Sequence, residues 1–136
     1  MNTSEIISAA RECLDTPFQH QGRLIGAALD CAGVVVHVAN KLGCEVVQPS
    51  AYSRSPSNGL LEFWADAQPY LERVNESQAG DILMMRFWKE PQHVGIFTGE
   101  NIIHAYENIK KVCEHRLSDV WAARVVRVYR FKGLTQ

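Results

Sequence analysis

The spacing of hydrophobic residues changes in character about halfway along the chain. Over Ser4 to Leu14, apolar side chains recur at the spacing of one helical face, which predicts an amphipathic helix. The residues of that face are Ile6, Ile7, Ala10, Cys13 and Leu14. Asp15-Thr16-Pro17 ends this helix, because proline disfavours helical backbone in the residue before it. A loop from Phe18 to Leu29 follows.

The segment from Asp30 to Gly43 fits two structures. Its four valines, Val34, Val35, Val36 and Val38, favour a strand. Its ends favour a helix, because Asp30 is a good N-cap and Gly43 a good residue just after a helix. We predict a helix that begins at Cys31. Because its apolar residues fall on nearly every face, this helix should be central and buried.

The second half reads mainly as strands. A Ser- and Pro-rich surface loop at 48–59 and a short helix at 60–68 precede the turn signal Gly80-Asp81. The strands are predicted at 82–88, 93–98, 101–106, 111–117 and 125–131, with a single helical turn at 118–123. Helices followed by an antiparallel meander of about five strands define an α+β fold. We expect one domain over residues 1–136.

Composition narrows the possible partners and surroundings. The formal net charge is −1, with 46% hydrophobic and 21% charged residues, so nothing indicates nucleic acid or an acidic membrane as partner. Because Met1–Ala10 lacks a basic segment, we expect no signal peptide and synthesis in the cytoplasm. The four cysteines form no Cys-x-x-Cys pair, so we expect reduced thiols, and neither a cofactor nor a metal.

Cys31 is the first candidate for chemistry. A helix N-terminus lowers a cysteine pKa, because its free N–H groups and the helix dipole favour the thiolate. Two backbone N–H groups of the first turn would then be free to hold an oxyanion, and Gly33 would let a substrate approach. The commoner fate of a lone cysteine is a buried structural position.

Two histidines strengthen the case. Gly99-Glu100 suits a two-residue hairpin turn, which pairs residues whose numbers sum to 199. His93 and His104 then project from one face as diagonal neighbours, and Gly95 between them leaves room above that face. A register slipped by one residue would separate the rings. Each histidine could equally be a satisfied, half-buried polar residue.

Together these residues suit nucleophilic catalysis. Cys31 would be the nucleophile and His93 the general base, forming a thiolate–imidazolium pair, with His104 orienting His93. Attack on an amide carbonyl would give a thioester acyl-enzyme that water hydrolyses. A zinc site built from the same three residues is less favoured, since they contain no closely spaced ligand pair. We assign His115 and Glu114 to solvent.

Several short motifs resemble the NlpC family of cell-wall cysteine peptidases in order and spacing. They are Thr16-Pro17-Phe18 with Gly22, Asp30-Cys31-Ala32-Gly33, Gly80-Asp81-Ile82-Leu83, His93-Val94-Gly95-Ile96 and Ile103-His104-Ala105. The stretch from Pro17 to Arg23 is most similar to the phage-tail-associated branch. This resemblance implies a papain-like core, a Cys31–His93–His104 triad and cleavage of peptidoglycan stem peptides, commonly between D-γ-glutamate and a diamino acid.

The chain departs from that pattern at two positions. Many relatives have tyrosine where Phe18 stands and serine where Ala32 stands, and both positions bear on substrate handling. His20 is a candidate to replace the tyrosine hydroxyl. The resemblance also implies tail-tip proteins as partners and incorporation into a virion tail. Two alternatives stay open: an inactive tail-assembly protein on the same fold, and an acyltransferase or amidase that uses the same triad.

Overall fold

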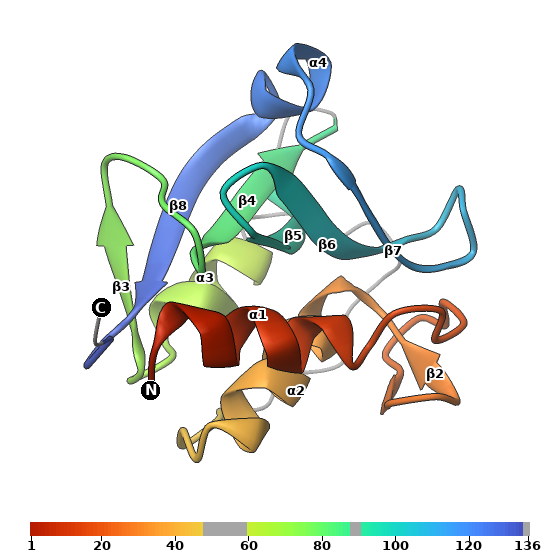
Figure 1. The fold of residues 1–136 in the computed structure, drawn as a ribbon, viewed down its shortest axis with the longest axis horizontal. Helices are drawn as coiled ribbons and strands as arrows, with labels where there is room; N and C mark the ends of the chain where they lie inside the picture. The colour runs from red at the N-terminus through yellow and green to blue at the C-terminus, as the bar shows by residue number, and fades with distance from the viewer. Residues whose placement is uncertain (48–59, 88–90, 135–136) are drawn as a thin grey trace.

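The fold combines four helices with an antiparallel sheet among the residues that the structure describes (Figure 1). The computed structural model describes residues 1–47, 60–87 and 91–134, so the loop predicted at 48–59 lies outside the described residues. The helices are α1 (Thr3–Arg11), α2 (Cys31–Lys41), α3 (Leu60–Asp66) and α4 (Asp119–Ala122). The strands are β1 (Arg23–Leu24), β2 (Ala28–Leu29), β3 (Leu71–Val74), β4 (Ile82–Arg86), β5 (Pro91–Phe97), β6 (Asn101–Tyr106), β7 (Lys111–Arg116) and β8 (Val125–Phe131).

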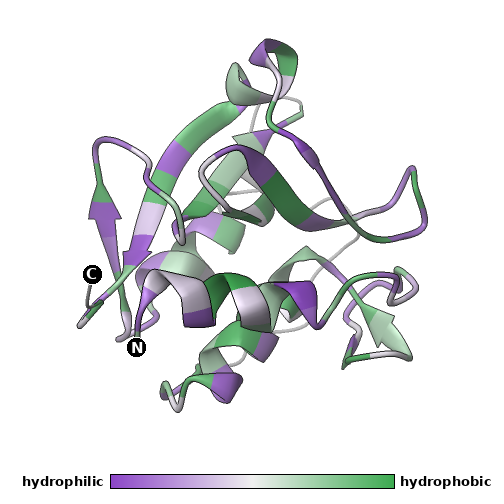
Figure 2. Cartoon of the chain, viewed as in Figure 1, coloured by the Kyte–Doolittle hydropathy of each residue, from purple (hydrophilic) through white to green (hydrophobic). Residues whose placement is uncertain are grey.

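The main sheet has six antiparallel strands in the order β3-β8-β4-β5-β6-β7. Helices α1 and α2 pack on one of its faces, where Val94, Ile96 and Ile103 join the main core. The opposite face carries a smaller core around Leu83, Met85 and Ile102. Figure 2 shows the hydrophobic stretches of α2 and of the central strands that supply these cores.

The ambiguous valine-rich segment is a helix, as its ends predicted. Asp30 caps α2 by accepting a hydrogen bond from the Gly33 N–H at 2.8 Å. Gly43 takes a φ of +77°, the left-handed conformation that commonly ends a helix. The valines are buried because α2 packs against both α1 and β5, and the burial of several faces outweighs their strand propensity.

The hairpin of β5 and β6 has the predicted register. Ile96 pairs with Ile103 and Phe97 with Ile102, and both sums are 199. The turn between them is Gly99-Glu100, with Gly99 at a φ of +105° and the Thr98 N–H donating to the Asn101 carbonyl at 2.8 Å. Side chains of His93 and His104 therefore project from the same face of the sheet.

The sequence missed one strand of the main sheet. Leu71–Val74 forms β3 and pairs with β8, from Leu71↔Phe131 to Val74↔Val128. Because the two strands are more than fifty residues apart in the sequence, no local turn signal predicts their pairing. The five predicted strands are present, with β3 as a sixth at the edge. Within the part of the chain that the structure describes, no helix is long and apolar enough to cross a bilayer.

Candidate active site

The loop before α2 fixes where the helix begins. The Asp30 carboxylate accepts hydrogen bonds from the Gln21 N–H at 2.9 Å and from Arg23 Nη1 at 2.7 Å, besides the one from Gly33. Gly22 lies so close to α2 that a Cβ on Gly33 would stand 2.5 Å from the Gly22 carbonyl oxygen. Gly33 therefore serves the contact between loop and helix. The 17–23 stretch anchors Asp30, and through it Cys31.

The Cys31 side chain is half-buried at the first position of α2, next to β5. The Phe97 N–H donates to the Asp81 carbonyl on the β4 side, so by strand alternation the Val94 N–H faces β6. Val94 lies beyond the paired positions of β5 and β6, and its N–H hydrogen-bonds the Cys31 sulfur. The Cys31 sulfur thus lies where the two strands separate, against Val94, the residue that follows His93.

Three histidine rings form a continuous chain across β5, β6 and β7. His93 Nε2 lies 2.6 Å from His104 Nδ1, and His104 Nε2 lies 2.8 Å from His115 Nε2. His115 Nδ1 lies 2.9 Å from the Arg116 carbonyl oxygen. Because His93 Nε2 is engaged by His104, Nδ1 is the His93 nitrogen outside this hydrogen-bonded series. Among the described residues, no hydrogen bond joins the His93 ring to the Cys31 sulfur.

Aromatic side chains enclose this histidine chain. The Tyr106 ring stacks on His104 at 5.3 Å, and Trp121 of α4 stands edge-on to His104 at 5.1 Å. Phe87 lies 5.3 Å from the His93 ring. Burial, then the positive charge of Arg124, lowers the pKa of His93 to about 3. Burial likewise lowers the pKa of His104 to about 2, so both rings are neutral at pH 7.

The thiol is neutral as well, which corrects the expectation from the helix N-terminus. Burial, and then the charge of Asp30, raise the pKa of the Cys31 thiol to about 12. Hydrogen bonds from the Val94 and Ala32 N–H groups oppose this shift but are the smaller effects. The predicted thiolate–imidazolium pair is therefore wrong for the resting protein, because the cap that fixes the helix also places a carboxylate beside the sulfur.

The remaining predicted site residues lie around Cys31 in different roles. Phe18 is half-buried, and its N–H donates to the Lys110 carbonyl at 2.9 Å. His20 is half-buried in the turn before β1, and the Ala32 side chain is buried in the main core. The side of Gly95 where a Cβ would stand is filled by side chains of β6, because that Cβ would lie 2.8 Å from the Ile102 side chain and 3.0 Å from His104 Cβ. Gly95 thus makes room for β6 side chains.

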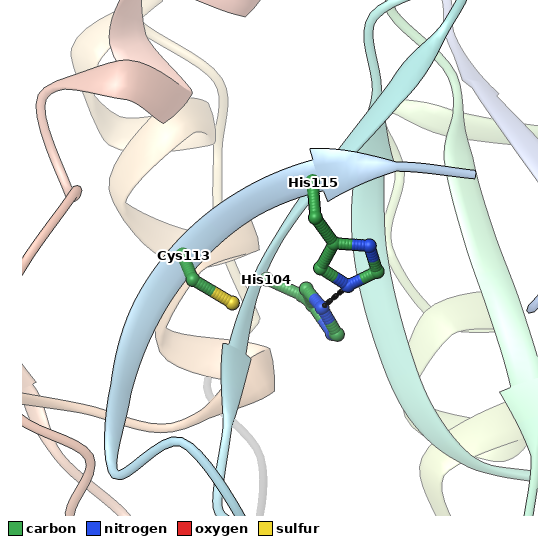
Figure 3. A group of neighbouring side chains, drawn as sticks. All are labelled: His104, Cys113 and His115. Carbon is green, nitrogen blue, oxygen red and sulfur yellow. Dashed lines mark hydrogen bonds between the residues drawn. The ribbon is translucent and has the colours of Figure 1, made fainter. Parts of the chain in front are cut away.

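A possible metal-binding group differs from the one weighed in the sequence. The ligand atoms of His104, Cys113 and His115 all lie within 4.8 Å of one another, on β6 and β7 (Figure 3). Two nitrogens on one tetrahedral zinc ion would stand about 3.3 Å apart, given bonds of about 2.0 Å. The 2.8 Å between His104 and His115 instead fits a hydrogen bond. The donor set suits zinc, but the spacing favours the hydrogen-bonded arrangement.

Sequence reasoning missed His115, which it assigned to solvent. In the β6–β7 register His104 pairs with Cys113, so His115 is a diagonal neighbour of His104, as His93 is across the other hairpin. The same diagonal argument would have found it if applied to β7. Arg124 and Trp121 gave no such signal, because they come from the α4 region, whose placement depends on the tertiary fold.

A cysteine at the start of a buried helix, set against a histidine-bearing antiparallel sheet, defines the papain-like α+β class. Within that class the chain belongs to the NlpC/P60 family, whose profile matches residues 15–130. No curated protein matches it in sequence.

Solved structures of similar fold agree with this assignment. An NlpC/P60 family protein from Bacillus cereus ATCC 10987 matches with a TM-score of 0.72 and 17% identity, over 96% of this chain and 40% of that one. The NlpC/p60 domain of the peptidoglycan hydrolase SagA matches with 0.66 and 20%, over 94% and 97%. An N-acetylmuramoyl-L-alanine amidase from Bacteroides uniformis ATCC 8492 matches with 0.63 and 15%, over 96% and 98%. The chain spans about two fifths of the B. cereus protein.

Proposed function

We propose that this chain is a cysteine hydrolase that cleaves an amide bond in peptidoglycan stem peptides. The observation that carries the proposal is the position of Cys31, at the first residue of α2, beside the strand residue that follows His93. The hydrogen-bonded His93–His104 pair supports it. Membership in the NlpC/P60 family supports the substrate class, as do a peptidoglycan hydrolase domain and an amidase among the structural neighbours.

In the proposed mechanism the thiol is neutral until substrate binds. His93 Nδ1 takes the Sγ proton of Cys31 as the sulfur attacks the amide carbon, so the S–C bond forms while the S–H bond breaks. The tetrahedral intermediate then expels the amine, which takes that proton from His93. Water attacks the remaining thioester with His93 again as base, and the freed thiolate recovers a proton. His104 keeps the His93 ring oriented throughout.

The backbone at the start of α2 supplies a candidate oxyanion donor. The Gly33 N–H is engaged by the Asp30 carboxylate, and the Ala32 N–H by the Cys31 sulfur. We therefore assign the oxyanion to the Cys31 N–H, which lies at the positive end of the helix. Phe18 and His20 precede this position in the loop that carries Gly22, where a substrate side chain would pass.

We further propose that the bond cleaved joins D-γ-glutamate to a diamino acid, and that the protein works in a phage tail with tail-tip proteins. The support is the resemblance of the 17–23 stretch to the phage-tail-associated branch. Incubation with tail-tip proteins followed by size-exclusion chromatography tests the tail assignment. Co-elution is expected; separate elution at micromolar concentrations would remove it.

Digestion of purified muropeptides, followed by mass analysis, tests the hydrolase. Wild type and Cys44→Ala should release the same fragments, while Cys31→Ala should release none and keep the wild-type circular dichroism spectrum. Cys44 is a matched control because it is half-buried beyond the other end of α2. A folded wild type that cleaves no muropeptide would favour the inactive assembly protein. Transfer to an added amine in place of hydrolysis would favour the acyltransferase.

A further inference from the structure

We infer that His115 is a positioning residue that fixes the tautomers of His104 and His93 and so presents a lone pair of His93 to Cys31. The inference deepens the proposed function and rests on it for the direction of proton transfer. It is carried by three hydrogen bonds in series, which begin at a main-chain carbonyl and end at the His93 ring.

The series begins at Arg116. Its carbonyl oxygen lies 2.9 Å from His115 Nδ1, and a carbonyl can only accept a hydrogen bond. His115 Nδ1 therefore carries a proton. A neutral imidazole has one N–H and one lone pair, so the lone pair of His115 is on Nε2.

The same logic passes along the next two bonds. His115 Nε2 accepts, so His104 Nε2 must donate across the 2.8 Å between them, which leaves the lone pair of His104 on Nδ1. His104 Nδ1 accepts in turn from His93 Nε2 at 2.6 Å. The His93 lone pair is thereby placed on Nδ1. Nδ1 takes no part in the hydrogen-bonded series, and it must be an acceptor if His93 is to take the proton of Cys31.

The surroundings hold this one arrangement. His104 is fully buried and His93 is only 6% exposed, so neither ring can exchange its partner for bulk water without opening the site. Trp121 contacts both His104 and His115, at 5.1 Å and 5.0 Å between ring centroids, and restrains the angle between them. Without an acceptor at His115, no hydrogen bond would stabilise the Nε2–H tautomer of His104, and both tautomers of His93 would become accessible.

Two substitutions distinguish the role of His115 as a hydrogen-bond acceptor from its role in packing. In His115→Gln the side-chain oxygen can still accept from His104 Nε2, whereas His115→Phe keeps a ring and removes the acceptor. His37→Gln is a control, because His37 pairs with Glu12 at 3.0 Å on the outer side of α2.

The first measurement is two-bond ¹H–¹⁵N correlation NMR of ¹⁵N-histidine-labelled protein at about pH 8, where free imidazoles are neutral. In wild type and in His37→Gln, His93 and His104 should show the Nε2–H pattern and His115 the Nδ1–H pattern. His115→Gln should keep the His93 pattern, and His115→Phe should give a mixture. A wild-type His93 that is Nδ1–H, or an unchanged pattern in folded His115→Phe, would overturn the inference.

The second measurement is muropeptide turnover. His115→Phe should lower kcat about tenfold or more with little change in KM, and His115→Gln should recover most of that loss. Equal loss in both variants, with the NMR patterns as expected, would reduce His115 to a packing residue and overturn the inference. If wild type shows the expected tautomers but cleaves nothing, the proposed hydrolase fails while the tautomer assignment stands.

Discussion

Cys31 is subject to two opposing influences from the same few residues. The first turn of α2 directs N–H groups and the positive end of the helix dipole at the sulfur, which favours a thiolate. Burial and the Asp30 carboxylate favour the thiol, and these two effects are the larger, so the pKa of Cys31 is raised. A protein with this balance does not hold a standing thiolate, so activation should accompany substrate binding.

Alkylation with iodoacetamide tests the resting state of Cys31. Because the pKa of its thiol is raised to about 12, the thiolate fraction should grow about tenfold per pH unit between about pH 6 and pH 9. The rate at Cys31, followed by peptide mass spectrometry, should rise with that slope. A plateau across this range would indicate a preformed thiolate–imidazolium pair and contradict the neutral resting state.

Asp30→Asn should make Cys31 more reactive. The amide oxygen can still cap Gly33, while the negative charge that raises the Cys31 pKa is removed and Arg23 loses its ion-pair partner. At a fixed pH near 8 the alkylation rate of Cys31 should therefore increase, and that of Cys113 should not. Asp30→Ala provides the contrast, since losing the cap costs about 1 kcal/mol. A slower Asp30→Asn protein that stays folded would argue against the assigned role of the charge.

At the scale of elements, the contact between the 17–23 loop and α2 determines where the nucleophile stands. Gly33 lies directly against the main chain of Gly22, because a Cβ on Gly33 would stand 2.5 Å from the Gly22 carbonyl oxygen. A Cβ on Gly22 would overlap the main chain of Ala28 and Gln19 within the loop itself. The sequence suggested that Gly33 leaves space for a substrate. The structure gives that space to the loop instead.

Gly33→Ala should therefore impair both stability and activity. Its Cβ would stand 2.5 Å from the Gly22 carbonyl, and relieving this overlap should cost about 1–3 kcal/mol and shift the start of α2. Gly43→Ala, at the other end of the same helix, should lose stability through its φ of +77° yet keep its turnover. Urea unfolding and muropeptide assays measure the two effects. Full activity in Gly33→Ala would show that the close approach is dispensable.

The hairpins explain which parts of the site the sequence could predict. A two-residue turn sits between β5 and β6, so local chemistry alone predicted the register that brings His93 and His104 together. The turn between β6 and β7 spans 107–110 and carries no comparable signal, so the diagonal position of His115 was not recognised. β3 pairs with a distant strand, and the side chains from the α4 region depend on the whole fold. Local order was predictable; long-range order was not.

On the scale of the whole molecule, the site draws on nearly the full length of the chain. Cys31 comes from the helical half, the histidines from three successive strands, and Trp121 with Arg124 from the segment before the last strand. The sheet holds His93 and His104 in an apolar interior, which lowers the pKa of each ring and keeps both neutral at pH 7. Folding therefore excludes protons that the unfolded chain would bind.

This exclusion predicts acid sensitivity. The unfolded histidines take up protons below about pH 6.5. The folded His93 and His104 stay neutral down to about pH 3 and about pH 2. The free energy of unfolding should thus fall by about 1.4 kcal/mol per pH unit for each ring between about pH 6 and pH 4.5, and be level above about pH 7. Urea titrations across this range measure it.

A matched pair of variants assigns that slope to the buried rings. His37→Gln, on the helix surface, should keep the wild-type dependence, whereas His93→Asn should lower the slope by about half. An equal slope in His93→Asn and wild type would mean that other groups take up the protons.

The two-residue link Gly99-Glu100 carries a consequence for how this protein can change over evolutionary time. A slip of one residue in the pairing of β5 with β6 would turn every side chain of β6 to the other face of the sheet, and His104 would then point toward α1 and α2. Gly99, with a φ of +105°, forms the short turn that sets this pairing, and L side chains rarely adopt that conformation. Descendants that stay active should therefore keep glycine at 99, while position 100 can vary.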